Sequence, residues 1–194
     1  ASCSSDDFLG ENPGTAQNAT TAINFGGEAG KITRATSNTA PTDAEKLDKQ
    51  FKVYGVKTPD GTMFHNVFVD YSVWYNENLT TSNTNKWEYV GQNNQTIKYW
   101  DYSAKEYRFV AGSPIDAFKF IQSTDLTTGT IINSAKISGL AGHIYANVAG
   151  TALKTDPVYV AEPVKVTNVK YNKPVTFNFI RQQAMVRVGV YETI

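Results

Sequence analysis

The chain contains a single cysteine, Cys3, among its 194 residues. One cysteine excludes an intramolecular disulfide framework and any metal site that needs several thiolates. An excess of charge of one sign is also missing, because 18 Lys and Arg residues balance 18 Asp and Glu residues. A nucleic-acid-binding domain normally carries a basic excess or stripe, so nucleic acid is not an expected partner. No run of about 18 apolar residues occurs, so no membrane-spanning helix is expected.

Motifs that carry catalytic chemistry are equally scarce. The two histidines, His65 and His143, lie far apart in the sequence, and neither has a carboxylate or a second histidine at ligand spacing. No Gly-x-Ser-x-Gly nucleophile elbow occurs. The glycine-rich stretches 24–27 and 139–142 lack the Lys-Ser/Thr that follows in a phosphate-binding loop. We therefore expect no enzyme activity, no catalytic residue, no metal and no cofactor.

Aromatic residues, in contrast, are abundant. The chain has 11 Tyr, 10 Phe and 3 Trp, whereas charged residues make up only 19%. This combination favours strands over surface helices. Short segments with an apolar residue at every second position recur along the chain, separated by turn signals. They indicate an all-β fold, either a sandwich or a barrel.

The alternation also identifies the expected core. In the strand around 67–73, Val67, Val69, Tyr71 and Val73 should share one face, opposite Asp70 and Ser72. Only two short helical turns are expected, over 44–49 behind Asp43 as N-cap and over 114–120. At least eight of the following residues should be buried: Phe51, Val53, Val67, Val69, Trp87, Tyr89, Tyr107, Phe109, Phe177, Phe179, Val186, Val188 and Val190.

Eight of the aromatic residues within positions 74–109 admit two interpretations. They are Trp74, Trp87, Tyr89, Tyr99, Trp100, Tyr102, Tyr107 and Phe109. Alternating members can fill the core, where aromatic side chains pack well across strands. An exposed row of rings would instead form a platform on which sugars stack. The second interpretation keeps a surface glycan-binding lipoprotein open as an alternative function.

The N-terminus resembles the end of a bacterial lipoprotein signal, in which two small residues precede a cysteine. Ala1 and Ser2 precede Cys3, and a polar stretch rich in Ser, Asp, Asn and Gly continues to about Ala22. Such a composition does not bury enough apolar surface to order itself. We expect Cys3 to carry the lipid and residues 1–30 to form a tether and N-terminal segment. The alternative is that Cys3 is incidental.

Several aromatic and β-branched motifs follow one another between about residues 30 and 194. They are Phe51-Lys-Val-Tyr54, Met63-Phe64-His-Asn-Val-Phe68-Val-Asp-Tyr71, Trp87-Glu-Tyr89, Tyr99-Trp100, Tyr107-Arg-Phe-Val-Ala111-Gly-Ser-Pro114, Lys173-Pro-Val-Thr-Phe-Asn-Phe179 and the strand from Ala184 to Thr193. This order of motifs resembles the fimbrillin family of Bacteroidota. Arg181 stands about where the family often has a histidine, which is a departure from its pattern.

The resemblance implies a fold, a location and a function. Residues 31–194 would form a transthyretin-like Greek-key β-sandwich of two sheets, followed in the family by a second sandwich, so the chain is expected to stop at a domain boundary. The protein would be a structural or adhesive subunit of a fimbrium, anchored in the outer membrane through its lipid. Its partners would be other fimbrial subunits, joined by β-strand addition, and ligands on host or bacterial surfaces.

The family also implies a processing site. Some members polymerise after a trypsin-like protease cuts behind an arginine in the N-terminal segment, which frees a groove for a strand of the next subunit. Arg34 and Ala35 stand where such a cut would fall. The strand before them, about 22–33, is then expected to dock as a removable edge. Alternatively, Arg34 is only a polar position on the first strand.

Replacing the lipidated cysteine tests the predicted anchor. In the full precursor, Cys3→Ala should release the protein from the outer-membrane fraction. The mutation removes the predicted attachment point of the acyl chains that would hold the protein in the membrane. Membrane fractionation and incorporation of a labelled fatty acid measure the effect. A mutant that stays with the membranes, beside a wild type that incorporates no label, would show that Cys3 is not a lipid site.

Overall fold

The structure is a computed structural model, and it describes residues 21–29, 43–91, 94–116, 118–122, 127, 132–137 and 158–182. The described part is all-β, as the alternating pattern predicts, with only two short helical turns. In chain order its elements are β1 (Phe25–Ala29), α1 (Asp43–Lys46), β2 (Gln50–Thr58), β3 (His65–Tyr75), β4 (Trp87–Glu88), β5 (Glu106–Ser113), β6 (Phe118–Gln122), β7 (Ile132–Ile137), β8 (Tyr159–Ala161), β9 (Val164–Thr167), the 3-10 turn η1 (Asn168–Lys170) and β10 (Val175–Arg181).

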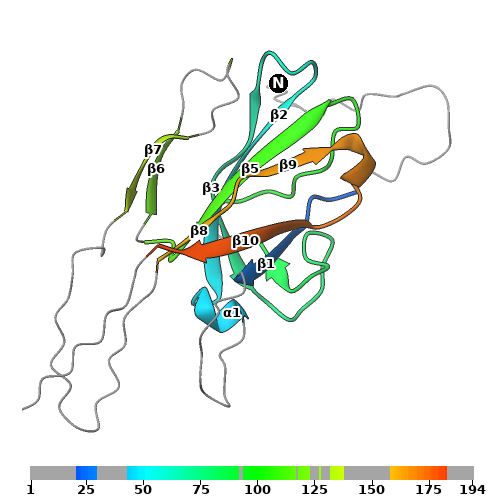
Figure 1. The fold of residues 1–194 in the computed structure, drawn as a ribbon. Helices are drawn as coiled ribbons and strands as arrows, with labels where there is room; N and C mark the ends of the chain where they lie inside the picture. Colours follow the sequence, from blue (N-terminus) through cyan, green and yellow to red (C-terminus); the bar gives the residue numbers. More distant parts are fainter. Residues whose placement is uncertain are drawn as a thin grey trace, which may run out of the picture.

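Eight strands join into one continuous sheet in the order β1-β10-β8-β5-β2-β3-β4, and β9 also pairs with β5. The central strand β5 is antiparallel to β2 on one side and to β9 and β8 on the other. Pro163, which has no N–H to donate, lies in the break between β8 and β9. β6 and β7 form a separate two-stranded sheet beside the large one (Figure 1).

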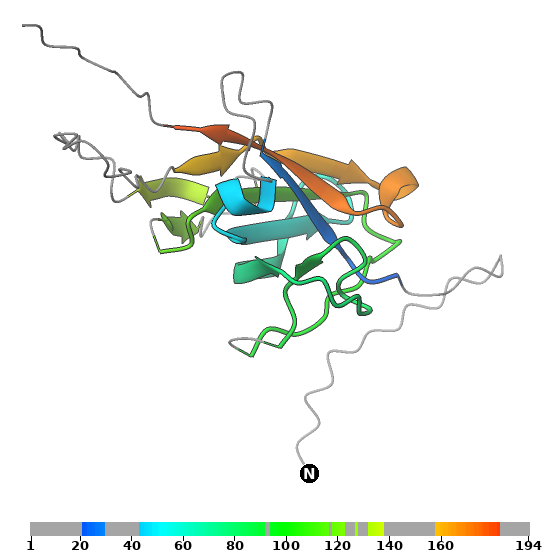
Figure 2. The same cartoon turned by 90° about the horizontal axis from the view of Figure 1, so that it is seen from below.

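The large sheet curls until its two ends nearly meet, which makes it almost barrel-like. β1, at one end of the strand order, lies beside β10 (Figure 2). The chain that follows β4, at the other end, returns to the residues just before β1, where Ala22 forms an antiparallel bridge with Tyr99. The Ile23 N–H donates to the Lys98 carbonyl at 2.8 Å. Both ends of the sheet therefore enclose one core.

That core contains the residues that the alternation selects. Burial is confirmed at eight of the thirteen expected positions: Phe51, Val53, Trp87, Tyr89, Tyr107, Phe109, Phe177 and Phe179. These residues come from one curled sheet, however, and not from two facing sheets. Tyr107, Phe109 and Ala111 face inward together along β5, and Val175, Phe177 and Phe179 do so along β10. Val186, Val188 and Val190 lie outside the described residues.

The predicted face of β3 is wrong at Val69, because the pairing of β3 with β2 contains two register shifts, whereas Val67, Tyr71 and Val73 do pack against the core. Val53 pairs with Tyr71, but Gly55, two residues further along β2, pairs with Phe68. The extra residue on β3 reverses the alternation, since successive side chains point to opposite faces of a strand. Phe68 is therefore fully buried, whereas Val69 is 45% exposed.

Gly55 is the small residue that this irregular pairing needs. A Cβ at this position would lie 2.7 Å from Cδ1 of Phe109 and 3.2 Å from Cδ2 of Phe68. Contacts that short do not occur without moving a ring, and both rings are fully buried. Glycine at 55 thus lets β3 and β5 bring their aromatic side chains together over β2.

The two expected helical turns have different outcomes. The turn behind Asp43 is present as α1, although it is shorter than the stretch 44–49 suggests. The helix expected over 114–120 is wrong, because a turn at Pro114–Asp116 leads into β6. β6 is antiparallel to β7, and three of its five residues, Phe118, Phe120 and Ile121, are aromatic or β-branched, a composition typical of strands.

Truncating one core ring tests the packing. Phe177→Ala should lower the free energy of unfolding by about 3–5 kcal/mol, since the ring is fully buried and the cavity does not collapse completely. Urea unfolding measures the change, and Val169→Ala, at a residue 77% exposed on η1, is the control. Equal stability of the two variants would contradict the assigned core.

Candidate functional site

The segment 21–29, which ends with β1, is the candidate functional site because it binds both ends of the curled sheet. β1 runs parallel to β10, with Phe25 opposite Val175 and Ala29 opposite Phe179. The Val175 N–H donates to the Asn24 carbonyl at 2.7 Å, which extends this ladder by one residue. On the opposite side the Trp100 N–H donates to the Thr21 carbonyl at 3.0 Å. The expected docking of a strand from about residue 22 is confirmed as far as Ala29.

Phe25 is the side chain that fixes this segment in the core. It is fully buried, as is Ile23 two residues before it on the same face. Its ring contacts five others, with centroid distances of 5.1 Å to Phe68, 5.6 Å to Tyr89, 5.8 Å to Phe177, 6.1 Å to Phe109 and 6.3 Å to Phe51. These five residues form what we call the Phe25 slot.

The slot draws its walls from five different strands or their immediate continuations. Phe177 comes from β10, Phe51 from β2, Phe68 from β3, Phe109 from β5, and Tyr89 follows β4 directly. Most of the ring pairs are edge-on, and only Phe25 and Phe177 are stacked, at 22°. Without segment 21–29, the slot would be an apolar groove open along β10.

Segment 21–29 also contains a buried side-chain amide, that of Asn24. Asn24 is buried, and its Nδ2 donates to the Ala22 carbonyl at 3.0 Å. Its Oδ1 has no hydrogen-bond partner among the described residues. An unsatisfied buried acceptor costs about 1–3 kcal/mol, which lowers the stability of the docked segment. Segment 21–29 is therefore held by two apolar side chains and weakened by the polar one between them.

Glu88 anchors the wall that presents Tyr89 to the slot. Its buried carboxylate accepts hydrogen bonds from Ser82 Oγ at 2.5 Å and Thr80 Oγ1 at 2.7 Å. The N–H groups of Tyr89 and Val90 donate to it at 2.9 Å each. Burial acts to raise the pKa of Glu88, but these four hydrogen bonds outweigh it and hold the pKa below its ordinary value. The loop 76–86, polar in sequence, is thereby tied to the core.

The predicted site residues lie on either side of the described segment. Cys3, Arg34 and Ala35 are all outside the described residues. β1 ends at Ala29, so the predicted cleavage position follows the docked strand in sequence. The importance of Phe25 was not evident from the sequence, because the alternation of Ile23, Asn24 and Phe25 spans only three residues before two glycines.

The aromatic cluster mostly fills the core. Trp87, Tyr89, Trp100, Tyr107 and Phe109 are buried. Tyr99 is 44% exposed and Tyr102 is 50% exposed, and both lie next to segment 21–29. Core packing thus explains most of these rings, and two tyrosines remain at the surface.

Lowering the pH tests the role of Glu88. A carboxylate whose folded pKa is depressed stabilises the fold above its unfolded pKa of about 4.3, and that stability is lost as pH falls through the folded value. Glu88→Gln should cost about 1.5–3 kcal/mol at pH 7, since the hydrogen bonds are made to a charge. The deficit should shrink towards pH 3. Urea unfolding between pH 7 and pH 3 measures this deficit, and Glu77→Gln, at an exposed position, is the control. Parallel stability profiles for wild type and Glu88→Gln across this pH range would contradict the role of Glu88.

Metal-binding and membrane-spanning features were also sought in the described part of the chain. There, no group of three or more His, Cys, Asp or Glu side chains could hold a metal ion. His65 is exposed on β3, and His143 lies outside the described residues. None of the helices described has the length and apolar character needed to cross a membrane. No protein-family model, curated protein or solved structure matches the chain.

Proposed function

We propose that this domain is a structural or adhesive subunit of a cell-surface fimbrium, and that its segment 21–29 occupies a site which a strand of the next subunit takes over. The protein is exported as a lipoprotein through Cys3, and cleavage after Arg34 starts the exchange. The Phe25 slot is the observation that carries this proposal. It is an aromatic groove at the end of a sheet, filled by a strand close to the N-terminus.

The physical basis of the exchange is strand addition to a sheet. An incoming strand gains backbone hydrogen bonds along β10 and inserts alternate side chains into the core. Ile23 and Phe25 show which side chains suit these positions, because both are fully buried. A donor strand with two large apolar residues at the same spacing, and no amide between them, would fill the slot without the unpaired Oδ1 of Asn24.

Cleavage after Arg34 changes the competition between the two strands. While the chain is intact, segment 21–29 is tethered to its own slot and has an effective concentration of about millimolar. After the cut, the segment is held only by its contacts and can diffuse away. The donor strand of a neighbouring subunit then competes with it on equal terms, so proteolysis acts as the switch for assembly.

The finer features of the family belong to this proposal. They are a transthyretin-like Greek-key arrangement of two sheets over residues 31–194, a following second domain, and anchoring at the outer membrane. The alternating segments and the curled all-β sheet support such a sandwich. A surface glycan-binding lipoprotein is the second candidate function, and the exposed Tyr99 and Tyr102 are the rings that favour it.

Arginine-specific proteolysis tests the exchange. The folded protein should be cut early after Arg34, whereas Arg108 in β5 and Arg181 in β10 resist, because paired strands are poor substrates. The cut protein should then release its N-terminal fragment and bind a labelled peptide of residues 21–33. Mass spectrometry identifies the cut, and fluorescence anisotropy follows the peptide.

A peptide carrying Phe25→Ala is the matched control and should bind at least tenfold more weakly, since a buried Phe→Ala change costs about 3–5 kcal/mol. Arg34→Ala protein, treated identically, should stay monomeric and bind neither peptide. If the protease spares Arg34, or if the cut form keeps its own fragment and ignores the peptide, the exchange mechanism is wrong. Immunogold labelling of native fimbriae then decides whether the subunit role stands without it.

A further inference from the structure

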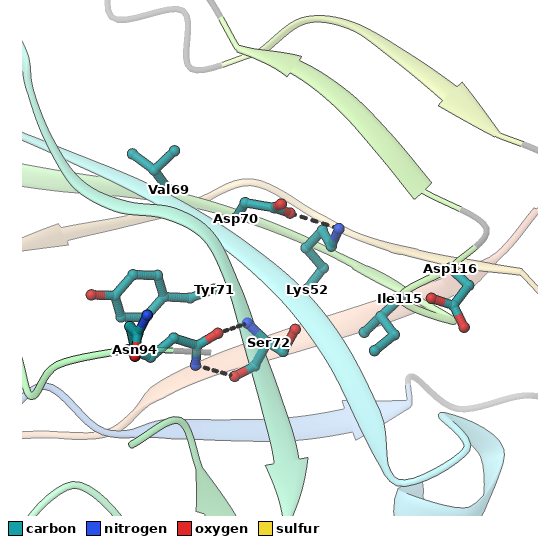
Figure 3. Close-up of a pocket in the computed structure, with 9 residues that line it drawn as sticks. Lys52, Val69, Asp70, Tyr71, Ser72, Asn94, Ile115 and Asp116 are labelled. Carbon is teal, nitrogen blue, oxygen red and sulfur yellow. Dashed lines mark hydrogen bonds and ion pairs between the residues drawn. The ribbon is translucent and has the colours of Figure 1, made fainter. Parts of the chain in front are cut away.

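A second site lies on the outer side of β3, away from the Phe25 slot. The bulge of β3, Lys52 of β2, the loop residues Asn94 and Gln95 and the turn at Ile115–Asp116 surround a hollow of about 470 Å³ (Figure 3). We call it the β3 hollow. Its volume falls within the range of about 300–1,000 Å³ that is typical of small-molecule sites.

The bulge in β3 positions the carboxylate of Asp70 at this hollow. Asp70 has a left-handed backbone with φ of 55°, which is uncommon for a residue with a side chain. Its Oδ1 forms an ion pair with Lys52 Nζ at 2.6 Å and accepts a hydrogen bond from the Tyr54 hydroxyl at 3.0 Å. Strained residues persist only where their surroundings hold them, and they cluster at functional sites. The bulge thus directs one carboxylate into a fixed position beside an ammonium group.

Gln95 fixes the opposite wall. Its Oε1 accepts from the Ser72 N–H at 2.7 Å and its Nε2 donates to the Ser72 carbonyl at 2.8 Å, as a neighbouring strand would. The same Nε2 also donates to the Tyr89 carbonyl at 2.5 Å. Gln95 is buried, so the loop is attached to β3 through a saturated amide. Asn94, next to it, is thereby held at the rim of the hollow.

Several polar groups at the hollow have no protein partner. Within the described residues, the Asn94 amide, the Asp116 carboxylate and Oδ2 of Asp70 make no hydrogen bond or ion pair. Asn94 has a left-handed backbone, with φ of 57°. These groups offer both donors and acceptors to a ligand. Val69 and the half-buried Tyr71 add apolar surface beside them.

The charges restrict the class of ligand. Among the lining residues the ammonium group is that of Lys52, which is already paired with Asp70, and Lys98 Nζ lies 5.9 Å from the centroid of the Tyr71 ring. An anion such as a phosphate, a sulfate or an acidic sugar would have to compete with the Asp70 and Asp116 carboxylates for these ammonium groups. A divalent cation normally takes six or more oxygen ligands, usually with more than one carboxylate converging on it, and no such cluster of three acidic groups is present in the described part of the chain. A neutral ligand with many hydroxyl groups matches the mixture of donors, acceptors and apolar contacts.

We propose that the β3 hollow binds one or two rings of a neutral sugar. Hydroxyl groups of the sugar donate to Asp70 and Asp116 and accept from the Asn94 amide, while a C–H face lies on Tyr71 or Val69. This inference deepens the adhesive part of the proposed function and supplies its ligand class. The sugar-binding inference does not depend on strand exchange, so either proposal can fail while the other stands.

Titration of the uncut protein with neutral methyl glycosides tests the site. Galactose, glucose, mannose, fucose and N-acetylglucosamine derivatives serve as probes, and amide NMR shifts locate binding. At least one glycoside should bind with a Kd of about 1 mM, the usual scale for a few hydrogen bonds. The shifts should concentrate on Tyr71, Ser72 and Asn94. A derivative of the bound glycoside that lacks one of the hydroxyl groups bonded to the site should bind at least tenfold more weakly, because the site's polar groups are left unpaired.

A pair of double variants separates the site from the rest of the surface. Asn94→Gly with Asp116→Ala should weaken binding about tenfold or more, since two hydrogen-bonding groups are lost. Glycine suits the left-handed backbone at 94, so the fold should be kept. Asn172→Gly with Glu77→Ala removes the same two group types from exposed positions elsewhere and should leave binding unchanged.

Four results would overturn the proposal. The first is the absence of any shift with all five glycosides up to about 20 mM, well above the expected Kd. The second is a set of shifts centred on Tyr99 and Tyr102, which would assign sugar binding to the exposed tyrosines. The third is equal loss of binding in the two double variants. Tighter binding of an acidic sugar than of every neutral one would also contradict it.

Discussion

The packing of Phe25 against five aromatic rings connects parts of the sheet that hydrogen bonds alone would leave apart. β1 is hydrogen-bonded to β10, yet its phenylalanine contacts residues of β2, β3 and β5. A curled sheet has to fill its interior, and here the ring that fills it comes from the strand nearest the N-terminus. Core stability and the accessibility of the slot therefore depend on the same residue, because any process that withdraws β1 also empties the core.

The bulge in β3 is the second constraint, and it acts on both faces of the sheet. Inward, it turns Phe68 towards Phe25, at 5.1 Å between ring centroids. Outward, it places Val69 and Asp70 at the β3 hollow. The register shift between Tyr71 and Phe68, one of two in this pairing, thus contributes a wall to the Phe25 slot and a carboxylate to the hollow. The two sites share the backbone of β3.

Much of the fold follows from alternation, and the failures have physical causes. Strands with a regular period, such as β5 and β10, bury the residues that the sequence selects, because nothing interrupts their pleat. The prediction for β3 fails because a bulge leaves no signal in the pattern of hydrophobic residues. The need for glycine at position 55, opposite the bulge, becomes clear only from the position of the Phe109 ring in the folded structure. Phe25 lies in a segment too short and polar to stand out. The hollow combines residues from four separate stretches, which no local pattern brings together.

The polar atom in segment 21–29 has a consequence for assembly. A segment that only stabilised the fold would be expected to carry an apolar residue or a paired amide at position 24, because the unsatisfied Oδ1 of Asn24 opposes docking. The tether compensates for this defect while the chain is intact, since it keeps the segment at high local concentration. In the proposed exchange, a cut tether would leave this defect to favour any strand that lacks it. The buried Oδ1 of Asn24, which has no partner among the described residues, would then give the proposed exchange a direction.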